Sequence, residues 1–302
     1  MKIMIAGGSG FVGRHLAEFL KRFDCHLTLI SRRPNSTVEH YDEIITWQQL
    51  GAYTSSDYDA VINLAGFSIS ARRWSNAVKA EIASSRINST HALIEFMARN
   101  AMHQSLLINA SAVGFYAFSD ERQDEDNYID NRDNHSFLHQ VAYEWEQAAL
   151  SALSHNIPLT ITRFGVVLGR DGGMLQKLLP SFKRGFGSVI SGGRQCISWI
   201  HVDDLCRALF FILKNHSRLE LYNLCSPYAV TQKQFAGTLA GALHKSLFLP
   251  LPAFMVKMMF GRMGQELLLS GQNIYPARLL KEKFTFDFAD IKVALDHLCA
   301  KG

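Results

Sequence analysis

The stretch Ile3-Met4-Ile5-Ala6-Gly7-Gly8-Ser9-Gly10-Phe11-Val12-Gly13 decides the fold, because it combines a buried strand, a glycine turn and the start of a helix. Gly7 permits a tight turn, Gly10 lets the backbone approach a pyrophosphate, and Gly13 lets the helix pack against the strand. The amides of the first helical turn then face the phosphates, and the helix dipole favours their negative charge. The spacing predicts a dinucleotide-binding loop, and a purely structural turn is the alternative.

The second expected strand ends in Thr28-Leu29-Ile30-Ser31-Arg32-Arg33-Pro34. A protein that binds NAD usually carries Asp or Glu at this place, where the carboxylate holds the ribose 2′-hydroxyl. Here Ser31, Arg32 and Arg33 stand instead, and guanidinium groups suit a phosphate dianion through paired hydrogen bonds. We therefore predict NADP(H) rather than NAD, with these three residues near the 2′-phosphate. A solvated arginine pair on a loop is the alternative.

Short apolar strands alternate with longer helical patterns in the first half of the chain. The expected strands are Lys2–Ala6, His26–Ile30, Glu43–Thr46, Ala60–Leu64, Ser105–Ala110 and Leu159–Phe164. The expected helices between them are Phe11–Arg22, Ala77–Asn100 and Phe137–Ser154. Repeated strand–helix units predict an α/β fold with a doubly wound parallel sheet of the Rossmann type, covered by helices on both faces.

The alternation of strands and helices becomes less regular after about residue 170, where glycines occur in several expected loops. We expect an NADP-binding Rossmann domain over residues 1–170, with its last strands returning from 190–225. Residues 171–302 then form a smaller C-terminal α/β lobe on the substrate side, including a distinct segment at about 248–298. Ligands of such sheets bind at the carboxyl ends of the strands, where this lobe would sit.

The composition is that of an ordinary globular protein, with 48% hydrophobic and 19% charged residues. A net charge of +4 over 302 residues, without a run of basic residues, argues against nucleic acid as a partner. The 12 histidines show no metal-ligand spacing, so we expect no metal site. Five scattered cysteines without a CxxC motif favour reduced thiols in a cytoplasmic protein.

Membrane segments are not expected, because no apolar run approaches the roughly 20 residues of a span. The first six residues read as a strand, which leaves no room for a signal peptide. The segment Leu247–Phe260 is apolar, but it is short and holds two prolines and a lysine. We interpret it as a buried element of the second lobe, and we expect no membrane partner.

Nine stretches spread along the chain carry the pattern of a known family. They are GGSGFVG at 7–13, SRRP at 31–34, NLAG at 63–66, SSRINST at 84–90, SAVGFY at 111–116, WEQAA at 145–149, RFGVVLGRDGG at 163–173, SGGRQCISWIHVDDL at 191–205 and LLLSGQNIYPARL at 267–279. The chain resembles the extended short-chain dehydrogenase/reductase superfamily and, more closely, its branch of epimerase family proteins with their own C-terminal domain. The resemblance implies a Rossmann-type fold, a dinucleotide cofactor and a cytosolic setting, but no particular substrate.

The resemblance also implies cofactor contacts beyond the glycines and arginines already named. Arg86 lies where many extended members have Asn, on the helix behind the nicotinamide. A cation there would hold a cofactor phosphate, a ribose or a substrate anion, and an exposed helix charge is the alternative. The full additional set is Phe11, Val12, Leu64, Ala65, Gly66, Arg86, Ser111 and Arg163.

The proton-transfer pair of the superfamily is missing. In the superfamily a Tyr and a Lys four residues later share one helix face, and the Lys lowers the pKa of the Tyr so that the phenol can pass a proton. When Trp145 sets the register, Leu138 occupies the Tyr position and Ala142 the Lys position. Tyr143 is close by, but Gln147 follows it at the required spacing.

Three residues are therefore the candidate catalytic groups. Ser111 lies one residue away from the position of the superfamily serine. Tyr116 ends the SAVGFY stretch near the expected nicotinamide, either as an acid or as a wall of the pocket. His201 belongs to the WIHVDDL stretch, whose alternative role is to join the lobes, with Asp203 or Asp204 capping the following helix.

We expect the residues that bind the substrate to follow Arg163 in the sequence. Arg194 in the GGRQ turn would bind a carboxylate or phosphate, and Trp199 would stack on a ring. Core packing is the alternative for Trp199. A homodimer is the assembly that the superfamily suggests, through a bundle of the helices at Ala77–Asn100 and Phe137–Ser154.

We predict an NADP(H)-binding oxidoreductase or epimerase that acts on an unknown small molecule without the Tyr–Lys pair. One alternative is a non-catalytic NADP(H)-binding sensor or scaffold. Another is a nucleotide-sugar enzyme that retains tightly bound NAD.

Overall fold

Seven parallel strands form the central sheet, as the alternation of strands and helices predicts. The computed structural model describes residues 1–32, 38–127, 136–215 and 219–300. Across the sheet the order is β11 (Leu219–Leu224), β7 (Leu159–Phe164), β5 (Leu106–Ala112), β4 (Ala60–Asn63), β1 (Lys2–Ala6), β2 (His26–Ser31) and β3 (Glu43–Thr46). Every neighbouring pair is parallel, which confirms the predicted Rossmann-type sheet.

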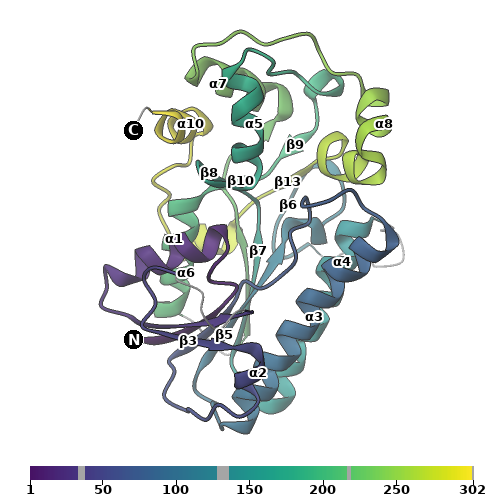
Figure 1. Cartoon of the computed structure of the whole chain (residues 1–302). Helices are drawn as coiled ribbons and strands as arrows, with labels where there is room; N and C mark the ends of the chain where they lie inside the picture. The colour runs from purple at the N-terminus through teal and green to yellow at the C-terminus, as the bar shows by residue number, and fades with distance from the viewer. Residues whose placement is uncertain (33–37, 128–135, 216–218, 301–302) are drawn as a thin grey trace.

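Helices cover both faces of this sheet (Figure 1). On one face Ile3 and Ile5 pack with Leu16 of α1 (Phe11–Lys21) and Leu209 of α6 (Val202–Asn215). On the other face Met4 packs with α3 (Asn76–Arg99) and with the end of α4 (Phe137–Leu150). Alternate residues of β1 therefore serve opposite faces, so a strand buried on both sides consists almost entirely of apolar residues.

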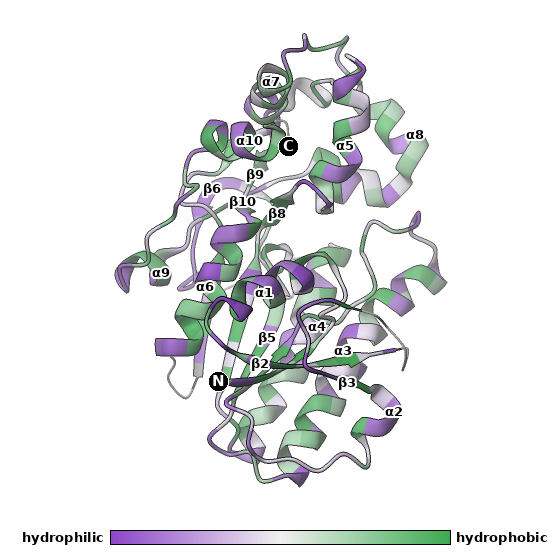
Figure 2. Ribbon diagram, turned by 60° about the vertical axis from the view of Figure 1, so that its left-hand side comes forward, coloured by the Kyte–Doolittle hydropathy of each residue, from purple (hydrophilic) through white to green (hydrophobic). Residues whose placement is uncertain are grey.

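A second lobe stands over the carboxyl edge of the sheet (Figures 1 and 2). Its helices are α5 (Gly173–Lys183), α7 (Gln232–Ala242), α8 (Ala253–Gly264) and α10 (Ile291–Cys299). Paired short strands join them: β8 (Val166–Gly169) with β10 (Trp199–His201), β9 (Cys196–Ile197) with β12 (Val230–Thr231), and β6 (Ser119–Gln123) with β13 (Gln272–Ile274). The remaining elements are α2 (Trp47–Leu50), α9 (Ala277–Lys281), 3-10 turns at Val113–Phe115, Ser151–His155 and Ser191–Gly193, and a π turn at Gln265–Leu269.

The end of the chain returns to the Rossmann sheet. Leu279 of α9 and Phe284 are buried in the same core cluster as β1 and α1. The second lobe has a core of its own around Leu175, Trp199 and Phe235, and Leu295 of α10 is buried in it. The C-terminal segment therefore contributes to both cores.

The prediction that the segment Leu247–Phe260 is a buried element of the second lobe is wrong. Leu249 is 72% exposed, Phe254 64% and Met258 69%, whereas Val256 is fully buried. Apolar composition indicates that a segment avoids water, but it does not show which surface covers the segment. No helix in the described ranges is both long enough and apolar enough to cross a membrane.

Candidate functional site

The glycine turn (Gly7–Gly13) joins the end of β1 to the start of α1. Gly7 has a φ of +78°, and a Cβ atom added there would lie 2.6 Å from the carbonyl carbon of Leu64. A Cβ atom on Gly13 would lie 2.4 Å from Cα of Gly8. Gly13 therefore lets α1 pack against the turn itself. Gly10 provides no side-chain cap, so the first-turn amides of α1 keep their hydrogen-bonding capacity for an anion.

The second lobe contacts the first turns of α1. A Cβ atom on Gly172 would overlap the ring of Phe11, at 2.1 Å from its Cγ atom. Asp171 accepts hydrogen bonds from Arg14 at 3.1 Å and contacts Nε2 of His15 at 2.7 Å. The Phe11 side chain thus joins the lobes. A cavity of about 460 Å³ lies beside this contact and reaches Ser9 of the glycine turn.

The end of β2 lies beside the glycine turn, because Ala6 of β1 pairs with Ile30 of β2. Ser31 is buried and Arg32 is exposed. Arg33 lies outside the described residues. The position that usually carries a carboxylate in NAD-binding proteins is therefore followed here by an exposed guanidinium group.

The end of β4 closes the other side of the turn. The backbone N–H of Leu64 donates to the carbonyl oxygen of Ala6 at 2.9 Å, and that of Ala65 donates to the Asn63 side chain at 3.1 Å. A Cβ atom on Gly66 would lie 3.0 Å from the guanidinium carbon of Arg86. The predicted NLAG contacts and Arg86 are therefore brought together next to the glycine turn.

Arg86 has no carboxylate partner among the described residues. Its Nη1 atom donates to the carbonyl oxygens of Phe67 at 3.0 Å and Ile82 at 2.8 Å, and its guanidinium lies 5.1 Å from the Trp145 ring centroid. Burial lowers the pKa of Arg86 to about 10. A half-buried cation held only by neutral groups is suited to receive an anionic group of a ligand.

Ser111 and Arg163 meet at Glu146, which the sequence analysis missed. The Arg163 guanidinium donates to both carboxylate oxygens of Glu146 at 2.8 Å, and Ser111 donates to the same carboxylate at 2.6 Å. All three side chains are buried. Burial alone would lower the pKa of Arg163, but the Glu146 carboxylate raises it. The only signal in the sequence was the WEQAA stretch, which places Glu146 next to a Trp on α4.

Tyr116 belongs to the core rather than to an open surface. Its ring is fully buried, and its hydroxyl donates to Oδ1 of Asn223 at 2.9 Å. Burial raises the pKa of Tyr116 to about 12. In this conformation the phenol is not presented to a substrate, and the ring packs in a core cluster with Val113, Cys225 and Ile274, so the structure places it in neither of its two predicted roles.

The two predicted substrate residues lie in different environments. Arg194 is exposed after the turn at Ser191–Gly193. Trp199 is fully buried in the core of the second lobe, where its Nε1–H donates to the carbonyl oxygen of Tyr228 at 3.0 Å. The structure therefore does not bring them together, and it places Trp199 in its alternative role of core packing.

His201 joins the lobes. Its Nδ1 atom accepts a hydrogen bond from the Asp203 backbone at 3.1 Å, so Nε2 carries the proton and donates to Nδ1 of His297 at 3.1 Å. The ring stacks on Phe288 at 3.9 Å between centroids. Asp204 accepts from the backbone N–H groups at 287 and 288, so it ties the C-terminal segment to α6 instead of capping that helix.

His201 is expected to make folding stability depend on pH. Burial and the neighbouring His297 lower its pKa to about 3, whereas an unfolded histidine titrates near about 6.5. The unfolded chain therefore binds more protons as the pH falls from about 6.5 toward about 3, and stability is lost over that window by up to about 1.4 kcal/mol per pH unit. Urea denaturation across this range should show a shallower loss for His201→Gln. The exposed-site control His91→Gln should keep the wild-type slope, and equal slopes in all three proteins would contradict the assignment.

Helix α4 carries no Tyr–Lys pair in its described residues, as the sequence predicts. Leu138 contacts the loop at Gly114, since a Cβ atom added to that glycine would lie 3.2 Å from Cβ of Leu138. Glu266 of the C-terminal segment accepts hydrogen bonds from the backbone N–H groups of Phe137 at 3.2 Å and Leu138 at 3.0 Å. A distant carboxylate therefore neutralises the first turn of α4.

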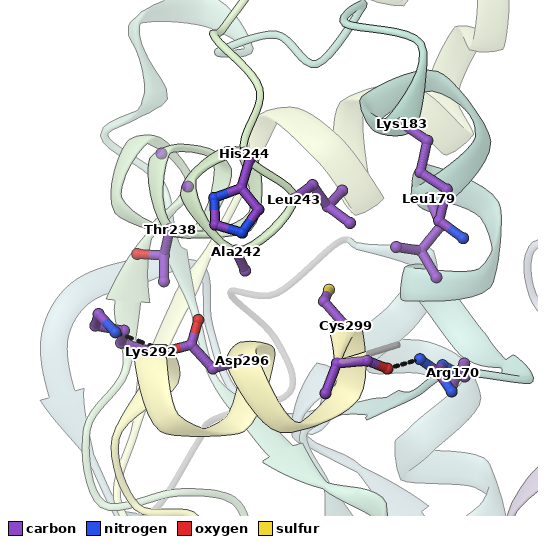
Figure 3. Close-up of a pocket in the computed structure, with 13 residues that line it drawn as sticks. Arg170, Leu179, Lys183, Thr238, Ala242, Leu243, His244, Lys292, Asp296 and Cys299 are labelled. Atoms are coloured by element: carbon purple, nitrogen blue, oxygen red, sulfur yellow. Dashed lines mark hydrogen bonds and ion pairs between the residues drawn. The ribbon is translucent and has the colours of Figure 1, made fainter. Parts of the chain in front are cut away.

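A larger cavity of about 1530 Å³ lies in the second lobe between α5, α7 and α10 (Figure 3). Arg170 at its wall donates to the carbonyl oxygens of Leu298 and Ala300, and Lys292 pairs with Asp296 at 2.6 Å. None of the predicted site residues lines this cavity.

Comparison with known proteins agrees with this architecture. Residues 3–225 match the NAD dependent epimerase/dehydratase family, and residues 251–298 match a domain of unknown function, DUF1731. An epimerase family protein of Staphylococcus haemolyticus is 32% identical over 98% of both chains. The epimerase family protein YfhF of Bacillus subtilis is 34% identical, covering 99% of this chain and 98% of its own.

A solved human structure is similar over the whole chain. It is the epimerase family protein SDR39U1 (isoform 2) with NADPH, which has a TM-score of 0.89 and 30% identity and covers 100% of both chains. The family match spans more than half of the sequence, and the relatives align over nearly all of it. The chain therefore belongs to the NAD dependent epimerase/dehydratase family.

Proposed function

We propose that the chain binds NADP(H) across the glycine turn and uses it as an oxidoreductase or epimerase of a small molecule. The observation that carries this proposal is the uncapped start of α1 beside the end of β2, where no carboxylate stands and the exposed Arg32 directly follows Ser31. The amides of α1 would hold the pyrophosphate, and Arg32 would pair with the 2′-phosphate. The human relative solved with NADPH supports the same cofactor.

The cofactor choice is expected to depend on Arg32. In Arg32→Glu a carboxylate replaces the guanidinium, so it repels the 2′-phosphate and can accept a hydrogen bond from a ribose hydroxyl. Fluorescence titration should show NADPH affinity falling by about tenfold or more, roughly 1.4 kcal/mol, with NADH affinity unchanged or improved. Arg22→Glu, an exposed change at the far end of α1, should leave both affinities unchanged. A purified protein that carries NAD and ignores NADP would contradict the proposal.

The bound nicotinamide would supply or accept a hydride. Arg86 is suited to hold an anionic group of the substrate or cofactor beside the end of β4, because it has cationic donors and no carboxylate partner in the described chain. The reaction would have to proceed without the superfamily's Tyr–Lys pair. A screen for NADPH oxidation with carbonyl compounds and sugar nucleotides tests turnover directly.

The second candidate function is a non-catalytic NADP(H) sensor or scaffold. The buried hydroxyl of Tyr116 favours it, since neither this phenol nor a Tyr–Lys pair offers an accessible acid. Tight NADPH binding with no turnover across the screen would support this candidate. Turnover that disappears in Arg86→Met, while NADPH still binds, would rule it out.

A further inference from the structure

An exposed apolar surface at the tip of the second lobe is not used by the proposed cofactor site. We call it the tip patch, and eight of the twelve exposed large apolar side chains in the described ranges belong to it. Its members are Phe186, Leu247, Phe248, Leu249, Phe254, Met255, Met258 and Met259. Such a concentration is unusual for a surface that faces only water, and it marks an interaction site.

A backbone contact and a ring contact join two parts of the tip patch, and the third part follows directly along the chain. The N–H of Phe248 donates to the carbonyl oxygen of Gly187 at 2.6 Å, and the Phe248 ring meets Phe186 edge-on at 5.6 Å between centroids. The chain then enters α8, where Val256 points inward while Phe254 and Met258 are exposed. Figure 1 shows this connection crossing the end of the second lobe farthest from the central sheet.

The charged residues in the two segments that carry the tip patch are all basic, and one of them, Arg262, pairs with Glu266 just beyond the second segment at 2.7 Å. Residues 172–202 and 221–265 contain no Asp or Glu. They contain eight exposed basic residues, which are Lys177, Lys183, Arg184, Arg194, Lys233, Lys245, Lys257 and Arg262. Because the whole chain has a net charge of +4 and these segments contribute +8, the rest of the chain carries −4. The positive charge is therefore concentrated in the lobe that carries the apolar patch.

We propose that the tip patch docks on the surface of an anionic phospholipid membrane. Aromatic and Met side chains at the level of the headgroups, with Lys residues among the lipid phosphates, are the physical features of an interfacial membrane contact. A second copy of the chain fits less well, because a two-fold contact would bring Lys245 and Lys257 of both copies against each other. The expectation of no membrane partner came from the lack of a spanning segment, which does not bear on surface docking.

Vesicle flotation with the full chain tests this proposal independently of the cofactor. The wild-type protein should float with vesicles of phosphatidylcholine and phosphatidylglycerol, should not float with phosphatidylcholine alone, and should be released by high salt. The double variant Phe254→Ser/Met258→Ser should lose binding. Lys245→Gln/Lys257→Gln should weaken it by roughly fivefold per charge, or about 25-fold in all.

Matched controls lie outside the tip patch. Val293→Ser on α10 and Lys281→Gln on α9 change exposed residues of the same kinds and should bind like the wild type. Thermal melting by circular dichroism shows that each variant remains folded. Lack of binding by the wild type, equal binding to neutral vesicles, or full binding by the Phe254/Met258 variant would overturn the proposal. A dimer in solution that this variant abolishes would also overturn it and would assign the patch to self-association.

Discussion

Replacing Glu146 with Gln is expected to lower the free energy of unfolding by about 3–5 kcal/mol. In the wild type the Glu146 carboxylate accepts two hydrogen bonds from the buried Arg163 guanidinium and one from Ser111. The substitution removes this negative charge and leaves the buried guanidinium without a charged partner. An uncompensated buried charge costs far more than a lost surface pair, because water cannot reach it. Urea denaturation at neutral pH, with the midpoint and slope compared between variant and wild type, measures the loss.

Two further variants distinguish the loss of the buried ion pair from a nonspecific destabilisation by substitution. Lys292→Gln removes an exposed pair on α10 and should leave the urea midpoint unchanged. Glu146→Gln combined with Arg163→Met removes both charges and should be more stable than Glu146→Gln alone. If Glu146→Gln unfolds at the wild-type midpoint, the Glu146–Arg163 pair does not stabilise the fold as we infer.

Replacing Gly13 with Ala is expected to reduce NADPH affinity by more than about tenfold, roughly 1.4 kcal/mol. The new methyl group would lie 2.4 Å from Cα of Gly8 and 2.7 Å from the carbonyl oxygen of Gly7, so α1 must move away from the turn. That movement displaces the first-turn amides that are proposed to hold the pyrophosphate. Fluorescence titration with NADPH gives the affinity.

Gly237→Ala is the matched control, because nothing lies within 4 Å of a Cβ atom added at this position of α7. It should leave NADPH affinity unchanged and should slightly stabilise the protein through better helix propensity. If Gly13→Ala binds NADPH as tightly as Gly237→Ala does, the glycine turn is not the phosphate site.

The central sheet could be predicted because its determinants are local. Apolar residues of β1, β4 and β5 are adjacent in sequence, and the glycine turn follows β1 directly. The segment Leu247–Phe260 shows the limit of the same method. Hydropathy does not show whether another part of the protein covers an apolar segment. This one is exposed at the tip of the second lobe.

The arrangement of strand ends around the glycine turn was more predictable than the contacts of the candidate catalytic residues. The positions of Gly7, Gly13 and the NLAG stretch follow from strand ends that meet at one edge of a parallel sheet. The burial of Tyr116 and the Glu146–Arg163 pair depend on contacts between distant segments, such as that between Tyr116 and Asn223. Residue type alone does not show whether a Tyr faces a substrate or an Asn in the core.

The hydrogen bonds from the start of α4 to Glu266 have a consequence for the order in which the protein is made. A ribosome synthesises residue 137 long before residue 266. The first amides of α4 therefore lack their acceptor, the Glu266 carboxylate, while most of the second lobe is translated. The core that holds Ile3 and Leu16 waits longer still, for Leu279 and Phe284. The Rossmann half of a nascent chain therefore stays incomplete until the last part of the polypeptide emerges, and during that time its apolar strands are open to chaperones and to aggregation.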